Sequence, residues 1–178
     1  NSENIICIDD DCIPDNNFIQ SHLKALNKIG NDRIILSGKV SFPKNLSVKS
    51  NFHRFRNERH RVYDHYYQNN SNIHFHNIVA MNISFKKNTI SNNNLFFDIE
   101  YNTYGLEDTQ FGLDAVDKGF KLQPVDASIL HMENTTIDLF VKKIRSFSKN
   151  YFFKFYEKNK EILRDKRLEL NTPNMLHS

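Results

Sequence analysis

Apolar residues are spaced along this chain in a pattern that predicts alternating strands and helices. Continuous apolar runs of strand length indicate buried strands, and four stretches have this character: residues 4–8, 33–42, 73–85 and 122–130. Apolar residues that recur every three or four positions indicate helices, as in residues 18–30 and 107–119, which both end at a glycine. This alternation predicts an α/β fold.

Two segments depart from the alternation. Residues 43–72 are polar, basic and aromatic without a clean period, which predicts a long loop or a loosely attached helix over the surface. From residue 137 to residue 155, apolar side chains recur every three or four positions, and lysine and arginine occupy the other faces. This spacing predicts a long amphipathic helix.

The composition then limits the class of protein. The 178 residues, 39% of them hydrophobic and 25% charged, are enough for one domain with its own core. A net charge of +3 is too small by itself to indicate nucleic-acid binding. No apolar run reaches the length of a membrane-spanning helix, and no signal peptide is visible. Cys7 and Cys12 are poorly placed for a mutual bridge, so a reducing compartment, the cytoplasm, is expected.

Three consecutive carboxylates, Asp9, Asp10 and Asp11, follow the first predicted strand. Adjacent like charges repel one another, and a divalent cation bound by their oxygens would offset the repulsion. The carboxyl ends of strands are also where open α/β sheets bind ligands. The alternative interpretation is a solvated acidic turn, or a helix cap provided by Asp15.

A second pair of carboxylates, Glu107 and Asp108, begins the predicted helix that follows Gly105. A carboxylate at this place accepts a proton from any hydroxyl that it reaches by hydrogen bonding, although an acidic pair also simply complements the helix dipole. His131 follows the last predicted strand. A lone histidine more often has ordinary structural contacts, but here it is a third polar group at the edge of one sheet.

These features occur in a recognisable order: a strand ending in "DDD", an apolar strand "NIVAMNISFKK", a helix start "GLED" and a strand ending at His131. In this order they resemble the second half of a GT-A glycosyltransferase of glycosyltransferase family 2, closest to chondroitin-polymerase-type and galactosyltransferase C-terminal-type domains. The resemblance covers about residues 3–133. It implies a GT-A-like sheet, mixed and mainly parallel, in which residues 1–133 form the acceptor-side half of the catalytic domain and residues 134–178 a C-terminal helical extension.

The resemblance also implies an activity, the metal-dependent inverting transfer of a sugar from a nucleotide-diphosphate donor to a glycan or glycolipid. The donor, expected to be a UDP-sugar, would be bound by Asp9, Asp10 and Asp11, with Asp9 near its ribose or a water on the metal. Asp11 and His131 would ligate Mn²⁺ or Mg²⁺.

On the acceptor side, the resemblance implies that Asp108 is the general base and that Glu107 holds the acceptor sugar.

Some features of the family are missing from this sequence. The chain starts at Asn1, just before the first strand, so the half that carries the nucleotide-base pocket is expected elsewhere. The motif reads Gly-Leu-Glu-Asp where many relatives have two glycines. There is no Gln-x-x-Arg-Trp motif and no Trp, which argues against the membrane-embedded processive synthases.

Two other classes of function compete with this one. "IICIDDDCI" also resembles the haloacid-dehalogenase phosphatase signature, with Asp9 as nucleophile and Asp11 as acid/base, but the expected small hydroxyl residue is missing and His131 would have no role. "HRFRNERHR" is typical of a phosphate- or RNA-binding surface, of a flap over the donor's diphosphate, or of a solvated segment paired with Glu58 and Asp64. No nucleic-acid partner is expected.

The amphipathic segment over residues 137–155 has two interpretations of its own. Its apolar stripe packs on the sheet or a neighbouring domain, or it rests on anionic lipid. The second interpretation would place a cytoplasmic enzyme at the inner face of the membrane, where bacteria build surface polysaccharides and glycolipids.

Overall fold

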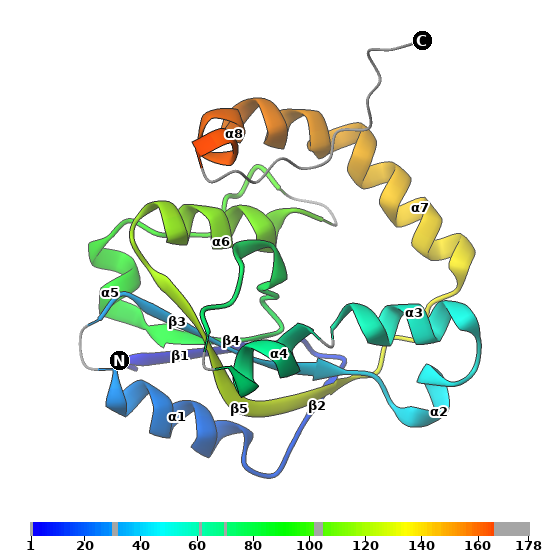
Figure 1. Ribbon diagram of the computed structural model, residues 1–178, viewed down its shortest axis with the longest axis horizontal. Coiled ribbons are helices and arrows are strands. Elements are labelled where there is room, and N and C mark those ends of the chain that lie inside the picture. The colour runs from blue at the N-terminus through cyan, green and yellow to red at the C-terminus, as the bar shows by residue number, and fades with distance from the viewer. Residues whose placement is uncertain (1, 30–31, 61, 70, 102–104, 166–178) are drawn as a thin grey trace.

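A mixed sheet forms the centre of the protein (Figure 1). The computed structural model describes residues 2–29, 32–60, 62–69, 71–101 and 105–165. Over these residues the sheet has the strand order β1-β4-β3-β5-β2. The strands are β1 (Asn4–Ile8), β2 (Cys12–Pro14), β3 (Ile34–Ser41), β4 (Asn82–Lys86) and β5 (Lys121–His131).

The expected α/β class is confirmed, but the direction of most strand pairs differs from the expectation. Within the described part of the chain, β3 and β5 pair in parallel. The pairs β1–β4, β2–β5 and β3–β4 are antiparallel. The sheet is therefore mixed, and the prediction that it is mainly parallel does not hold for these strands.

Helices cover both faces of this sheet (Figure 1). Helix α1 (Phe18–Lys28) lies on one face, and α6 (Glu107–Asp117) lies on the other, with α8 (Phe153–Asp165) stacked over it. The remaining helical elements are α2 (Lys44–Ser47), α3 (Asn51–Arg59), α4 (Val62–Gln68), η1 (Phe75–Asn77), α5 (Lys87–Asn92), α7 (Ile137–Phe147) and a π-helical turn, η2 (Ser148–Phe152).

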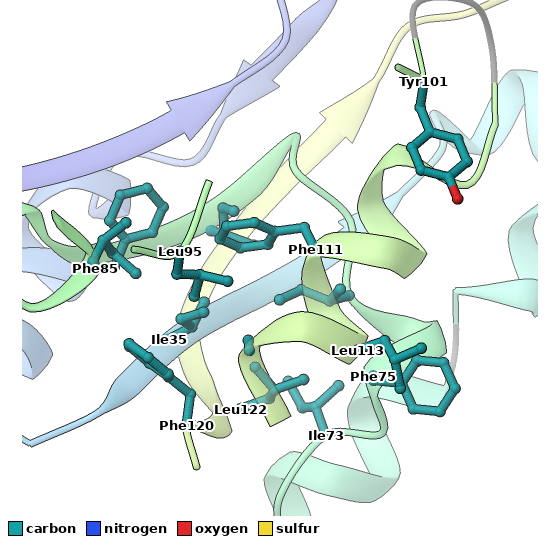
Figure 2. Close-up of a cluster of buried hydrophobic side chains, with 14 of the residues drawn as sticks. Ile35, Ile73, Phe75, Phe85, Leu95, Tyr101, Phe111, Leu113, Phe120 and Leu122 are labelled. Carbon is teal, nitrogen blue, oxygen red and sulfur yellow. The ribbon is translucent and has the colours of Figure 1, made fainter. Parts of the chain in front are cut away.

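Side-chain alternation along β3 divides the apolar core into two parts. Successive residues of a strand point to opposite faces, so Ile35 joins the cluster under α6 while Ile34 and Leu36 join the cluster under α1. Figure 2 shows the first cluster, in which Phe111 of α6 lies near Leu95, with Ile35 of the sheet beneath them. Because β3 is central and buried on both faces, its sequence reads as a continuous apolar run.

Strand β1 is less buried than its apolar run predicts. Residues 4–7 are half-buried and Ile8 is 41% exposed. Among the described strands β1 pairs with β4 alone, so it lies at an edge. An apolar run does not distinguish an edge strand from a central one.

Residues 43–72 contain helices rather than a long loop. Helix α3 begins after Ser50, whose hydroxyl accepts a hydrogen bond from the backbone N–H of His53, as an N-cap does. The predicted helix over residues 137–155 is present as α7, η2 and the start of α8. No described helix combines the length and the apolar character required to cross a membrane.

Candidate metal and carboxylate site

The end of β1 turns back toward the end of β5. The backbone N–H of Cys12 donates to the carbonyl of Asp9 at 3.2 Å, which closes a turn. The chain then enters β2, which pairs with β5 so that Cys12 lies opposite His131. The N–H of Met132 donates to the Asp11 carbonyl at 2.9 Å and fixes this register.

This pairing brings an acidic and an imidazole side chain into contact. His131 Nε2 lies 3.2 Å from Asp11 Oδ2, within hydrogen-bonding distance. His131 is 8% exposed, and its ring packs against Phe42, with ring centroids 5.4 Å apart. The Asp11 side chain is 45% exposed, so the pair has one buried member and one that faces solvent.

A thiol completes a group of three metal-binding side chains. Cys12 Sγ lies 3.9 Å from Asp11 Oδ1, and one ligand atom each from Asp11, Cys12 and His131 all lie within 4.8 Å of one another. Ligand atoms this close converge on one ion after small side-chain movements, so the residues fit a divalent cation. Asp10 is exposed at the turn.

Asp108 is the most strongly perturbed carboxyl group near this turn. Burial raises the pKa of Asp108 to about 7, and the charges of Glu107 and Asp9 act in the same direction, whereas a hydrogen bond from the backbone of Ala80 opposes the rise. Oε2 of Glu107 is buried and has no hydrogen-bond partner among the described residues.

Electrostatic coupling places the two predicted carboxylate groups in one neighbourhood. Asp9 is an exposed residue, but partial desolvation of its carboxyl group and the negative charge of Asp11 hold its pKa above the usual value, while His131 acts against the rise. Burial also raises the pKa of the Cys7 thiol, and the charges of Asp9 and Asp108 both add to this effect. The predicted residues Asp9, Asp11, Asp108 and His131 are thus brought to one end of the sheet, where β1 and β5 finish.

The backbone turn that holds Asp108 is supported by a buried polar network. The N–H of Asn82 donates to the carbonyl of Val79, closing the turn that contains Ala80. The Asn82 side-chain amide donates to the carbonyls of Lys39 and Ala127, which ties β4 to both β3 and β5. His22 Nε2 lies 3.0 Å from Asn82 Oδ1, so α1 joins the same network.

The C-terminal helices hold the other side of the carboxylate pair. Gly105 has φ +106°, and a Cβ placed on it would lie 2.9 Å from Cδ2 of Phe147. One turn into α6, the amide groups of Gln110 and Asn159 donate to each other's oxygens at 3.2 and 2.8 Å. Both side chains are buried. The start of α6, which carries Glu107 and Asp108, is therefore held by contacts with Phe147 of α7 and Asn159 of α8.

The basic segment has a structural role at one of its arginines. Arg56 pairs with Glu133, and its guanidinium lies 4.5 Å from the centroid of the Phe42 ring. Arg56 is 7% exposed. Its pairing with Glu133, which lies two residues after the end of β5, links α3 to that strand. Asp64 pairs with Lys39 rather than with an arginine of the segment. Arg54 is exposed, and the side chain of Arg59 lies outside the described part.

A cavity of about 230 Å³ lies beside the turn that holds Asp108. Its lining combines β3 with residues of the α3–α4 region and of the segment before β4. It includes the polar and aromatic side chains of His60, Tyr63, Tyr66, His76 and Asn77, together with Val79. Val79 is also the first residue of the turn that contains Ala80. No pattern in the sequence indicates this cavity, because its lining residues come from three separate segments.

Comparison with known proteins adds no assignment, since no family model and no curated protein matches the chain.

Proposed function

We propose that this chain is part of a metal-dependent inverting glycosyltransferase with a GT-A-like fold of the family 2 type. It would transfer a sugar from a nucleotide-diphosphate donor, a UDP-sugar in the simplest case, to a glycan or glycolipid. The observation that carries this proposal is Asp108, a buried carboxyl group whose pKa is raised to about 7 close to Asp9. Next to Asp9 lies the Asp11–His131 pair, which fits a cation.

Asp108 has the properties of a general base. A catalytic base works best when its pKa is near the operating pH, and a group with a pKa of about 7 is half ionised at neutral pH. Its carboxylate would take the proton of the acceptor hydroxyl as that oxygen attacks the donor sugar. Attack from the side opposite the departing diphosphate inverts the anomeric centre.

Glu107 and the cavity beside the turn are suited to the acceptor. The unpartnered Oε2 of Glu107 would accept a hydrogen bond from a sugar hydroxyl, which satisfies a buried polar atom. The cavity of about 230 Å³ offers histidine, tyrosine and asparagine side chains that pair with hydroxyl groups. Both features would orient the acceptor toward Asp108.

Asp9, Asp10 and Asp11 would face the donor in this proposal. Asp11 and His131 would hold Mn²⁺ or Mg²⁺, which when bound neutralises charge that develops on the leaving diphosphate. Asp9 is exposed beside Asp11, so it is accessible to the donor's ribose. The pocket for the nucleotide base would come from chain outside this sequence.

Contact with a membrane surface is part of the same proposal. Helix α7 has exposed apolar residues on one side, Ile137, Val141 and Ile144, and lysines on its other faces. Such a helix lies on anionic lipid, which would bring the enzyme close to a glycolipid or surface-polysaccharide acceptor. Co-sedimentation with anionic vesicles tests this part, and a chain that stays in the supernatant contradicts it.

The function is tested by measuring UDP release from UDP-sugars in the presence of Mn²⁺ and a panel of glycan acceptors, with this chain assayed together with the half that would supply the nucleotide-base pocket. We expect kcat/KM to rise with pH through about 7, because the active form of Asp108 is ionised, and Asp108→Asn to lower the rate by about 10²–10⁴. Asp117→Asn is the matched control, because Asp117 is an exposed carboxylate on the same helix.

Two results would contradict the proposal: no acceptor-dependent UDP release from any donor, or full activity in the Asp108→Asn variant. Phosphate release from a phosphomonoester that requires Asp9 would instead favour the phosphatase interpretation.

A further inference from the structure

We propose that Cys12 is a third protein ligand of the metal ion and that the site therefore prefers a thiolate-binding ion such as Zn²⁺ or Co²⁺ to Mg²⁺. This inference rests on the proposed function, because it concerns the cation at Asp11 and His131. It adds a ligand that the spacing of the carboxylates does not indicate.

The backbone pairing places the Cys12 thiol on the same side of the sheet as the imidazole. Cys12 and His131 are direct partners in the antiparallel pair of β2 and β5. The hydrogen bond from Met132 N–H to the Asp11 carbonyl flanks this pair, which makes it a non-hydrogen-bonded pair. In such pairs the Cα atoms are only about 4.5 Å apart, and the side chains lie close together.

Asp11 is the third ligand of the group. It lies before β2, so its side chain need not follow the alternating directions of side chains along a strand. Its two oxygens face the other two ligands, with Oδ2 3.2 Å from His131 Nε2 and Oδ1 3.9 Å from Cys12 Sγ. With zinc bonds of about 2.0–2.3 Å to oxygen, nitrogen and sulfur, tetrahedral ligand atoms are separated by about 3.3–3.6 Å. The two separations from Asp11 differ from these by a few tenths of an ångström, and one ligand atom from each of the three residues lies within 4.8 Å of the others.

The chemistry of the three ligands determines which ion they select. Mg²⁺ prefers six oxygen ligands in an octahedron, whereas a set of one oxygen, one nitrogen and one sulfur is typical of Zn²⁺ and Co²⁺. Three protein ligands leave one tetrahedral position for a substrate oxygen. The exposed Asp11 side chain shows that the group is open to solvent. The Cys12 thiol would lose its proton to solvent as the sulfur–metal bond forms.

The competing explanation is that Cys12 is only a packing residue. It lies against the apolar cluster under α1, and a thiol commonly serves as a small hydrophobic side chain. Packing alone predicts no bond between sulfur and a metal ion. Direct detection of that bond therefore distinguishes the two explanations.

The experiment is a titration of the reduced 178-residue chain with Co²⁺, followed by absorption spectroscopy. A sulfur-to-cobalt charge-transfer band in the near ultraviolet reports a thiolate ligand, and visible d–d bands report binding by any set of ligands. We expect both in the parent chain, with Zn²⁺ displacing Co²⁺ and Mg²⁺ failing to do so. Cys12→Ala should lose the charge-transfer band and about tenfold or more in affinity. Cys7→Ala, which removes the other free thiol, should retain the band.

The outcomes separate this inference from the proposed function. One such outcome is Co²⁺ binding that depends on Asp11 and His131 but gives no charge-transfer band. This result would retain the metal site proposed at Asp11 and His131, but it would overturn the role of Cys12. A band that persists in Cys12→Ala would also overturn it. Absence of any Co²⁺ binding by the parent chain would overturn both the inference and the metal part of the proposed function.

Discussion

Replacement of Asp108 by Asn should make the protein more stable at neutral and basic pH, although it removes the proposed base. The pKa of Asp108 rises from 3.8 to about 7 on folding, chiefly because the carboxyl group is buried. The folded state therefore keeps a proton that the unfolded chain loses above about pH 4. Stability contributed by this group falls as pH rises from about 4 to about 7, since the folded state binds more protons in that window.

The magnitude follows from the size of the shift. About three pKa units at about 1.4 kcal/mol each give a cost of about 4 kcal/mol once Asp108 is ionised in both states. Asn has nearly the same shape, stays neutral and keeps an oxygen that can accept the hydrogen bond from the Ala80 backbone. The stabilisation by Asp108→Asn should therefore grow from about 2 kcal/mol at pH 5 to about 4 kcal/mol at pH 8.

Urea unfolding of the parent and variant at pH 5, 6 and 8 measures this difference. The control Asp117→Asn, at an exposed position in the last turn of α6, should change the free energy of unfolding by less than about 0.5 kcal/mol. The reasoning is refuted if Asp108→Asn is no more stable than the parent at pH 8. A gain in stability that does not vary with pH also refutes it, because the cause would then not be the ionisation of Asp108.

Two further predictions concern the packing that holds the site. Gly105→Ala should lower the free energy of unfolding by about 1–3 kcal/mol, because φ is +106° and the new Cβ meets Phe147. Gly119 also has a positive φ, +79°, but a Cβ there would meet no atom closer than 3.7 Å. Gly119→Ala should therefore lower the free energy of unfolding by less in the same urea assay. An equal decrease would contradict the steric part of the argument. Arg56→Met should cost about 1–3 kcal/mol by leaving Glu133 with Lys143 alone. In thermal melts Arg56→Lys should keep only part of the stability that Arg56→Met loses. Stability equal to that of the parent would show that the planar guanidinium is not required.

The apolar pattern predicts those strands and helices that carry an apolar run or an apolar face in their own sequence. Three of the strand runs match β1, β3 and β5, and the periodic stretches form α1 and α6. The run over residues 73–85 contains the 3₁₀ turn η1 and becomes strand only at β4. For α3 the sequence leaves a loop and a helix as alternatives, because this helix has no apolar face of its own. It is held instead by the pairing of Arg56 with Glu133 and by the stacking of Arg56 on Phe42, contacts between segments that are far apart in sequence.

Strand register is the information that the sequence lacks at the candidate site. Three carboxylates after a strand indicate a cation, and Asp11 and His131 do lie within contact. The short strand β2 is hidden by the turn signal at Pro14, however, and only its pairing with β5 places Cys12 opposite His131. A one-residue slip would turn Cys12 to the other face of the sheet, so its place in the site follows only from the folded backbone.

The environment of Asp108 depends equally on distant parts of the chain. On one side, Asn82 and His22 fix the turn from which the Ala80 backbone reaches the carboxylate. On the other side, the Gln110–Asn159 amide pair ties α6 to α8, and Phe155 of α8 belongs to the apolar cluster under α6. Burial of Asp108, and hence its raised pKa, requires the sheet and the C-terminal helices together. A carboxylate in the first turn of an isolated helix would be solvated and stabilised by the helix dipole, and it would not be protonated near neutral pH.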